Sequence, residues 1–220
     1  MPRIGLIGGT GDEGRGLAVR FALAGEEVLI GSRSRERAEQ AAAVVRSRLG
    51  EKAHQIVAGT NVDAAGEAEI VCVCLPMPAV NETLSDLRQS LRGRTVIEVI
   101  NPVRRTAQGF EPVLLAAPSA AEWVAALLPE AEVVSAFKTF SAAHLANLER
   151  PLQGDAFICG DGRETKQQVL DLVRRIPRLR PVDCGALRNA RYVEAAGVLI
   201  LEINRRHRAT ASLRVLGLDD

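Results

Sequence analysis

Three glycines near the start of the chain are spaced in a way that could hold a phosphate group. Gly9, Gly11 and Gly14 fit the pattern G-x-G-x-x-G, between an apolar run at residues 4–7 and a helical pattern. In this context the first glycine permits a tight turn, the second lets backbone approach a pyrophosphate, and the third allows close packing of helix and strand. Amides at the helix N-terminus would bind the phosphates. A glycine-rich turn without a ligand is the alternative interpretation.

The residues after the second apolar run favour NADP over NAD. An NAD enzyme usually places Asp or Glu about twenty residues beyond the glycine loop, on the ribose 2′-hydroxyl. This chain has Ser32 and Arg33 there instead, with Arg37 one turn along. A serine hydroxyl can donate to a 2′-phosphate, and an arginine can form a charge-assisted fork with it. For Arg35 and Arg37, a solvated helix face is an equally good interpretation.

Two further apolar runs should end at the same crevice, because ligands of open parallel sheets bind beyond the carboxyl ends of the strands. The fourth run ends at Leu75 and Pro76, which we expect to line the ribose or the nicotinamide. The next run ends at Asn101, whose amide could hydrogen-bond a substrate or the carboxamide. The Asn-Pro pair is also typical of turns, so both interpretations stand for Asn101.

The four cysteines predict neither a metal site nor a disulfide scaffold. Cys72 and Cys74 are two residues apart within an apolar run, so on a strand both would point to the same face. Cys159 and Cys184 stand alone in the sequence. Since free cysteine is among the most buried residue types, we expect all four to be packing residues.

Composition and charge exclude several classes of protein. The chain has 220 residues, of which 47% are hydrophobic, and this excludes a disordered or fibrous protein. Its 28 basic and 27 acidic residues leave a net charge of +1, which gives no reason to expect nucleic acid or a membrane surface as a partner. No apolar run reaches the roughly 18 to 20 residues of a membrane span. The first residues enter a strand pattern without a secretory signal, so we predict a cytoplasmic protein.

The elements that must position these residues alternate between short apolar runs and amphipathic stretches, which predicts an α/β fold with a parallel sheet. Ser34 should cap the second helix. The predicted strands are residues 3–7, 27–30, 55–59, 70–75, 95–99 and 133–136, and the clearest helices are residues 14–24, 34–49, 79–91 and 120–128.

The pattern changes after about Asn147. Two short strands, at 156–159 and 181–183, flank a helix at 163–176, so we predict a small second α/β portion at residues 148–220 beside a first domain at residues 1–147. The last helix, at 187–208, has a longer apolar stripe than a monomer readily covers. We therefore expect a homodimer.

Five segments together resemble the F420-dependent NADP reductase family. They are GGTGDEGRGLAVRFALAGEEVLIGSRSRERA, VVSAFKTFSAAHLANL, CGD, LRPVDCGALRNARYVE and the C-terminal LGL. The resemblance implies a Rossmann-type doubly wound parallel sheet with a small C-terminal α/β portion and a long C-terminal helix. It also implies a homodimer that transfers a hydride between NADP(H) and the deazaflavin coenzyme F420, its co-substrate.

Site residues follow from the resemblance by position. The implied cofactor-binding residues are Gly9, Thr10, Gly11, Asp12, Glu13, Gly14, Ser32, Arg33, Arg37, Leu75, Pro76 and Ala136. The implied deazaflavin pocket consists of Val103, Phe137, Lys138, Phe140, Ala143, Ala186 and Leu187. This chain departs from the family at 138–141, where it reads Lys-Thr-Phe-Ser in place of His-Thr-Ile-Pro or a similar stretch. The departure leaves the second substrate open.

The implied mechanism needs no acid or base. A hydride passes between C4 of the nicotinamide and C5 of the deazaflavin when the two ring faces are held roughly 3 to 3.5 Å apart. Of the three histidines, His54 and His207 are expected to be structural, and only His144 is a candidate for the site. Lys138 could neutralise negative charge on a reduced deazaflavin, or it could simply face solvent.

Two other functions remain open at this stage. An NADPH-dependent reductase of another acceptor, such as a flavin, a ferric chelate or an imine, is favoured by the altered segment at 138–141. A dimer that senses NADP without catalysis would need a closed nicotinamide pocket, for which the sequence has no signal.

Overall fold

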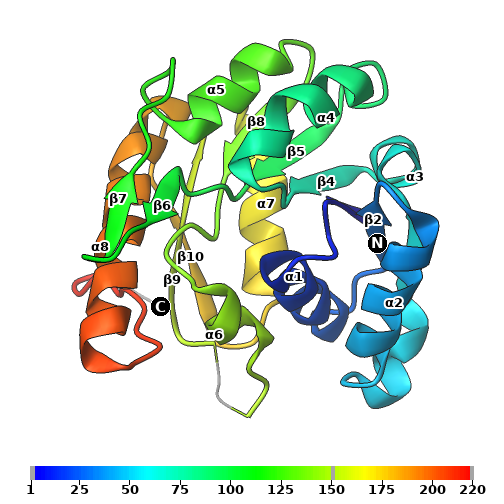
Figure 1. Ribbon diagram of the computed structural model, residues 1–220, viewed down its shortest axis with the longest axis horizontal. Coiled ribbons are helices and arrows are strands. Elements are labelled where there is room, and N and C mark those ends of the chain that lie inside the picture. Colours follow the sequence, from blue (N-terminus) through cyan, green and yellow to red (C-terminus); the bar gives the residue numbers. More distant parts are fainter. Residues whose placement is uncertain (1–2, 150–151, 219–220) are drawn as a thin grey trace.

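A single eight-stranded sheet forms the centre of the molecule in the computed structural model, which describes residues 3–149 and 152–218 (Figure 1). The strand order is β10-β9-β8-β5-β4-β1-β2-β3, and every neighbouring pair is parallel except β8 and β9. The strands are β1 (Ile4–Ile7), β2 (Val28–Ser32), β3 (Ile56–Thr60), β4 (Ile70–Val73), β5 (Thr95–Glu98), β8 (Glu132–Ser135), β9 (Gly154–Gly160) and β10 (Leu179–Asp183).

Helices cover both faces of this sheet and bury an apolar core on each. Helices α1, α2, α6 and α7 pack on one face, and α3, α4, α5 and α8 pack on the other. The helices are α1 (Asp12–Leu23), α2 (Arg35–Arg46), α3 (Asn61–Glu67), α4 (Val80–Leu87), α5 (Ala120–Leu127), α6 (Ala142–Ala146), α7 (Arg163–Arg174) and α8 (Ala190–His207), with short 3-10 turns η1 (Gly50–Gln55), η2 (Met77–Ala79) and η3 (Leu187–Asn189). The predicted doubly wound sheet is therefore confirmed.

The strand order reverses at β1. The chain runs from β1 outward to β2 and β3, then returns to place β4 on the other side of β1. In open parallel sheets this reversal opens a crevice beyond the carboxyl ends of the two strands. The glycine loop follows β1 and therefore lies at this crevice.

Most predicted elements are present within a few residues of their expected bounds. Ser34 caps α2 as expected, because its hydroxyl accepts a hydrogen bond from the Arg37 amide at 3.4 Å. The prediction missed the short helices α3 and α6 and an antiparallel hairpin of β6 (Val103–Arg105) and β7 (Phe110–Pro112). Thr60 and Asp63 form a capping box at the start of α3, a signal that was available in the sequence.

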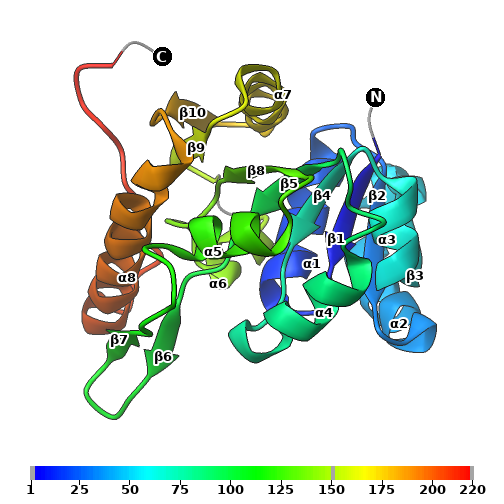
Figure 2. The ribbon, with the colours of Figure 1, turned by 90° about the horizontal axis from the view of Figure 1, so that it is seen from above.

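The C-terminal elements extend the same sheet. The predicted strands and helix after residue 150 are present as β9, α7 and β10, and β9 joins β8 with Ser135 opposite Cys159. The division into 1–147 and 148–220 stays a prediction, and its outer ends, residues 1–2 and 219–220, lie outside the described residues. Figure 2 shows α8 and the β6–β7 hairpin together at one end of the molecule, far from α2 and β3.

Candidate functional site

The glycine loop after β1 is a tight turn that only glycine fits at two positions. Gly8 has a φ of +71°, a conformation that side chains disfavour. A Cβ on Gly14 would lie 2.6 Å from the Cα of Gly9, so α1 packs directly against the turn. The amide of Gly9 donates to the carbonyls of Leu6 and Gly31, which joins the loop to β1 and β2. Gly8 is a loop residue that the spacing argument overlooked.

Gly11 faces open space. It is the N-cap of α1, and a Cβ built there would meet nothing within 4 Å. No side chain caps this helix end, so its first amides are available to an anion. Asp12, in the first turn, is exposed and pairs with Arg15 at 2.5 Å, and Arg15 also donates to the carbonyl of Thr10. This arrangement fits the pyrophosphate of a dinucleotide.

Two arginines beyond β2 are available to a 2′-phosphate. Ser32 is buried at the end of β2, and its hydroxyl accepts from the Ser34 amide at 3.4 Å. Arg33 and Arg37 are exposed, and within the described residues neither forms an ion pair with a carboxylate. Arg35 differs, because it pairs with Asp63 at 2.6 Å. The exposure of Arg33 and Arg37 is therefore compatible with the predicted contact to a 2′-phosphate.

The other predicted cofactor residues lie at the same edge of the sheet. Leu75 is buried beside the glycine loop, since a Cβ on Gly8 would come within 2.8 Å of its side chain. Pro76 is exposed next to it. Ala136 follows β8, is buried, and donates its amide to the carbonyl of Glu98 at the end of β5. The structure thus brings the carboxyl ends of β1, β4, β5 and β8 together.

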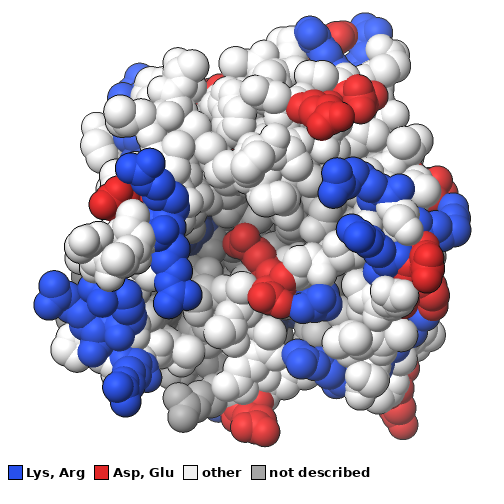
Figure 3. All heavy atoms as spheres, viewed as in Figure 1, with Lys and Arg blue, Asp and Glu red and all other residues white. Residues whose placement is uncertain are grey.

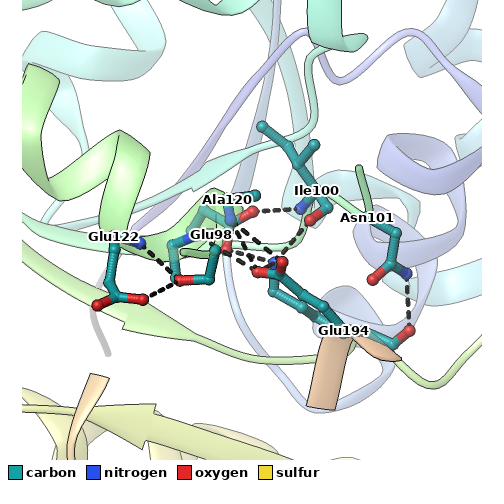
Figure 4. A network of polar contacts seen from close by, with 9 residues as sticks. Glu98, Ile100, Asn101, Ala120, Glu122 and Glu194 are labelled. Carbon is teal, nitrogen blue, oxygen red and sulfur yellow. Dashed lines mark hydrogen bonds and ion pairs between the residues drawn. The ribbon is translucent and has the colours of Figure 1, made fainter. Parts of the chain in front are cut away.

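Lys138 is buried near these strand ends. Figure 4 shows Glu98 and Glu194, the two carboxylates that pair with it. Its ammonium lies 2.6 Å from Oε2 of Glu98 and 2.9 Å from Oε1 of Glu194, and it donates to the carbonyl of Ile100 at 2.6 Å. Lys138 therefore does not face solvent, which corrects that expectation, and its role beside a reduced deazaflavin stays a prediction.

The Lys138 network joins four parts of the chain. Glu194 comes from α8 and also accepts hydrogen bonds from the amides of Ala120 and Ala121 at the start of α5. Glu98 ends β5, and its other oxygen accepts from the Ile100 amide at 2.6 Å. The buried lysine therefore holds β5, α5, α8 and the segment after β8 in fixed relation.

The backbone around Lys138 is strained and tightly packed. Phe137 has a φ of +62°, which is uncommon for a residue with a side chain. Its ring is fully buried against Phe21, with centroids 5.7 Å apart, so it belongs to the core and does not line the crevice as predicted. The Asn101 amide donates to the Lys138 carbonyl at 2.7 Å. Gly197 of α8 packs on the same carbonyl, where a Cβ would come within 2.6 Å.

Glu13 faces this network from the first turn of α1. Burial raises the pKa of Glu13 to about 7, against the opposing effect of Lys138, and Glu98 adds to the rise. Glu13 in turn contributes to the raised pKa values of Cys72 and Cys74, after burial. The Glu13 side chain is half-buried in the first turn of α1.

Three other predicted pocket residues lie on the β6–β7 hairpin or on the segment that follows Lys138. Val103 is half-buried at the start of β6, Phe140 is buried with its ring 5.9 Å from that of His144, and Ala143 is exposed on α6. His144 is buried, and its carbonyl accepts a hydrogen bond from Arg20 of α1. These residues lie on the segment that follows Lys138 or on the adjacent hairpin, so they remain candidates for the pocket.

Ala186 and Leu187 follow β10, several strands away from the glycine loop. β9 is antiparallel to β8, with Gly160 opposite Val134, and the Gly185 carbonyl accepts a hydrogen bond from the Gly160 amide. Leu187 is buried in the core that includes α5. The place of Ala186 and Leu187 in the second pocket stays a prediction.

Two cysteines that stand alone in the sequence are neighbours in the structure. Cys184 continues the ladder between β10 and β9, donating its amide to Ile158, which places it opposite Cys159. Both are free thiols, and a hydrogen bond from Cys159 lowers the pKa of Cys184. Nothing in their spacing of 25 positions signals this contact, which depends on strand register.

Figure 3 shows that the face seen in Figure 1 is hollowed near its middle, with acidic side chains beside the hollow. Basic side chains gather on the left, over β6 and the end of α8, where Arg104, Arg105, Arg205 and Arg206 are exposed.

A cavity of about 1040 Å³ lies along the outer edge of β10, away from the glycine loop. Over residues 3–149 and 152–218, the structure contains no helix with the length and apolar character of a membrane span.

Comparison with known proteins agrees with this site. Residues 3–102 match the family model described as NADP oxidoreductase, coenzyme F420-dependent. The chain is 36% identical to the F420-dependent NADP reductase of Methanothermobacter thermautotrophicus, over 99% of this chain and 96% of the relative. It is 35% identical to the enzyme of the same name from Methanocaldococcus jannaschii, over 99% of both chains. A solved structure from Arthrobacter sp. FB24, 22% identical, superposes over the whole of both chains with a TM-score of 0.80, which shows the shared fold.

Proposed function

The chain belongs to the family of F420-dependent NADP reductases, and from that premise we propose that it transfers a hydride between NADP(H) and coenzyme F420. The reduced nicotinamide supplies the hydride and the deazaflavin accepts it, or the reverse. The protein's part is to bind both ring systems in one dry crevice, with their faces in contact. The observation that carries the proposal is the identity of 36% along nearly the entire chain.

The residues proposed for NADP(H) lie at the reversal of strand order. The amides of Gly11, Asp12 and Glu13 would hold the pyrophosphate at the start of α1, where Thr10 completes the loop. Ser32, Arg33 and Arg37 would bind the 2′-phosphate. Leu75, Pro76 and Ala136 would form the wall behind the nicotinamide ribose and ring.

The second ring would lie against the segment after β8. We propose Val103, Phe140 and Ala143 as its contacts, since they lie on the segments that follow β5 and β8. Lys138 would support this wall from within. Its ammonium contacts Glu98, Glu194 and the Ile100 carbonyl, and its own carbonyl accepts from the Asn101 side-chain amide, so these contacts would keep the wall in place when a ligand enters.

The decisive experiment follows NADPH oxidation with purified F420 through the deazaflavin absorbance. FMN, FAD and a ferric chelate serve as alternative acceptors, and NADH replaces NADPH in a parallel reaction. We expect rapid F420 reduction that depends on NADPH. If NADPH binds and no F420 is reduced, the NADP site stands and the second substrate differs from that of the family.

One observation favours a different acceptor as a second candidate. The family segment expected at 138–141 is replaced here by Lys-Thr-Phe-Ser, and the structure encloses Lys138 completely while Phe140 packs on His144. A pocket rebuilt at these positions would suit a different acceptor from the family's deazaflavin. Turnover with FMN or a ferric chelate in the same assay, without turnover of F420, would establish this candidate.

A homodimer is also part of the proposal. Tyr192 and Leu199 project from α8 with 70% and 58% of their surface exposed, which leaves an apolar stripe uncovered in the monomer. Sedimentation equilibrium on the purified protein tests it, and a monomer at micromolar concentration would contradict it. The cytoplasmic location expected above stays a prediction.

A further inference from the structure

Cys159 and Cys184 are adjacent thiols near one edge of the sheet. Cys159 lies in β9, and Cys184 directly follows β10, the edge strand. The Cys184 amide donates to the Ile158 carbonyl at 2.8 Å, and the Gly160 amide donates to the Gly185 carbonyl at 3.0 Å. These two hydrogen bonds hold the chain after β10 alongside β9 on both sides of the pair, so Cys184 lies beside Cys159.

The strand register suits a covalent bond between the two sulfur atoms. Residues opposite each other on neighbouring parallel strands point to the same face, and such strands lie about 4.7 to 4.9 Å apart. A disulfide requires Cα atoms roughly 4.4 to 6.8 Å apart. Both thiols are free and already in contact, because a hydrogen bond joins their side chains.

The two thiols differ in burial and in ionisation. Cys159 is fully buried, and its hydrogen bond with Cys184, followed by burial, raises the pKa of its thiol. Cys184 is half-buried, and the hydrogen bond from Cys159 lowers the pKa of its thiol against the effect of burial. Lys166 donates to the Gly185 carbonyl at 3.2 Å and lowers this pKa further, while Asp183, paired with Lys166 at 2.9 Å, raises it. Cys184 is therefore the thiol that an oxidant meets first, with Cys159 behind it.

Cys184 is also bonded to the turn that leads into α8. Its carbonyl accepts a hydrogen bond from the side chain of Asn189 at 2.7 Å. In the same turn the Leu187 amide donates to Oδ1 of Asp161, which follows β9, at 3.0 Å. A covalent bond between Cys159 and Cys184 would therefore fix this turn to the end of β9.

We propose that Cys159 and Cys184 form a modification site, at which a hydroperoxide oxidises the pair to a disulfide within one chain. A small oxidant suits the site, because a half-buried sulfur is reached more easily by a hydroperoxide than by a bulky disulfide. The glycine loop and the arginines proposed for NADP(H) follow β1 and β2, several strands away. The inference therefore goes beyond the proposed function and does not depend on it.

The reaction with hydrogen peroxide takes place in two steps. The Cys184 sulfur attacks one peroxide oxygen and the O–O bond breaks, so that the departing hydroxide takes the thiol proton and a sulfenic acid is left on Cys184. The Cys159 sulfur then attacks the Cys184 sulfur, the S–O bond breaks, and the departing hydroxide takes the Cys159 proton. The products are one disulfide and two water molecules, and two electrons pass from sulfur to peroxide.

The test maps disulfides in the full chain. The reduced protein is treated with hydrogen peroxide, the remaining thiols are alkylated, and tryptic peptides are analysed by mass spectrometry with and without a thiol reductant. We expect one peptide pair joined through Cys159 and Cys184, lighter than the separate peptides by two hydrogen atoms and released by the reductant. The Cys184 thiol should be lost about tenfold faster than that of Cys74, which is also half-buried but whose pKa is raised by burial.

Serine variants locate each step. Cys159→Ser should stop at a sulfenic acid on Cys184, which dimedone traps. Cys184→Ser should form no cross-link and should leave the buried Cys159 unreacted. Cys74→Ser is the matched control and should form the cross-link as readily as the unaltered protein. Circular dichroism establishes that each variant is folded.

Several results would overturn the inference. One is loss of the Cys184 thiol no faster than that of Cys74. Another is a sulfenic or sulfinic acid that persists on Cys184 in the unaltered protein while Cys159 stays free. A cross-link found only between two chains on a non-reducing gel would also contradict it. None of these results bears on hydride transfer, which the oxidation of NADPH tests separately.

Discussion

Arg33 is the residue on which the choice between NADP and NAD depends. Its guanidinium is exposed directly after Ser32 and pairs with no carboxylate among the described residues. Arg33→Ala should weaken NADPH binding by about 1 to 3 kcal/mol, the range for a hydrogen bond to a charged group, and should change NADH binding little. Fluorescence titration with both dinucleotides measures this difference.

The control for that substitution lies two positions along. Arg35 is equally exposed but pairs with Asp63, so Arg35→Ala should leave the preference for NADPH intact. Equal losses for NADPH and NADH in Arg33→Ala would exclude a role at the 2′-phosphate.

Lys138 should matter most for stability. Among the described residues, Lys138→Met removes the only cation that faces Glu98 and Glu194 at ion-pair distance, and an uncompensated buried charge costs about 3 to 5 kcal/mol. Urea unfolding measures the loss. Adding Glu98→Gln to the variant should recover part of it, because one of the two stranded carboxylates is then neutral. A loss of less than about 1 kcal/mol would show that the network is not a stabilising clamp.

How far single residues can be predicted depends on whether their role is local. The glycine loop and the arginines after β2 are defined by spacing along one strand-turn-helix unit, and the structure places them as expected. Lys138 is different, because its partners come from β5 and from α8, more than 35 positions away on either side. A lone lysine in an apolar context carries no signal for such partners, so the solvent-facing interpretation was wrong, and the role beside the deazaflavin stays a prediction.

At the scale of elements, the turn between β1 and α1 allows folding and binding to be separated. A Cβ on Gly11 meets no protein atom within 4 Å, so Gly11→Val should fold with nearly unchanged thermal stability. Its side chain would occupy the space of the pyrophosphate, so NADPH affinity should fall by at least tenfold. Calorimetric titration beside a thermal melt checks both.

Gly66 of α3 provides the matched control for Gly11→Val. It also has open space around a built Cβ but lies in a helix away from the loop. Gly66→Ala should bind NADPH normally and should stabilise the protein by about 0.4 to 1 kcal/mol. Normal NADPH affinity in Gly11→Val would contradict the placement of the pyrophosphate.

The elements that were predicted correctly are those whose apolar pattern is complete within one segment. The parallel strands are continuous runs of Val, Ile and Leu, and the long helices have clear stripes. Helix α6, five residues long, is defined mainly by its packing on α1, and the direction of β9 depends on pairing with β8. Such tertiary determinants leave no periodic pattern, which explains why helix α6 and the antiparallel step were missed.

At the scale of the whole molecule, buried carboxyls should make stability fall above mildly acidic pH. The pKa of Glu13 rises from 4.5 to about 7 in the folded state, so its contribution is complete below 4.5 and is lost as the pH rises through about 7. Glu98, raised by burial, acts in the same direction. Thermal melts from pH 5.5 to 8.5 should show a decreasing Tm, with a weaker slope in Glu13→Gln. A Tm that increases over this range would contradict the prediction.

The interior position of β1 has a consequence for synthesis of the chain. β1 precedes the other strands of the eight-stranded sheet, and each of these adds to an edge that already exists: β2 and β3 on one side, then β4, β5, β8, β9 and β10 in order on the other. No strand has to insert between two earlier ones. The sheet can therefore grow outward on the ribosome as the polypeptide emerges, and until β9 arrives the backbone edge of β8 is left open to pairing with another nascent chain.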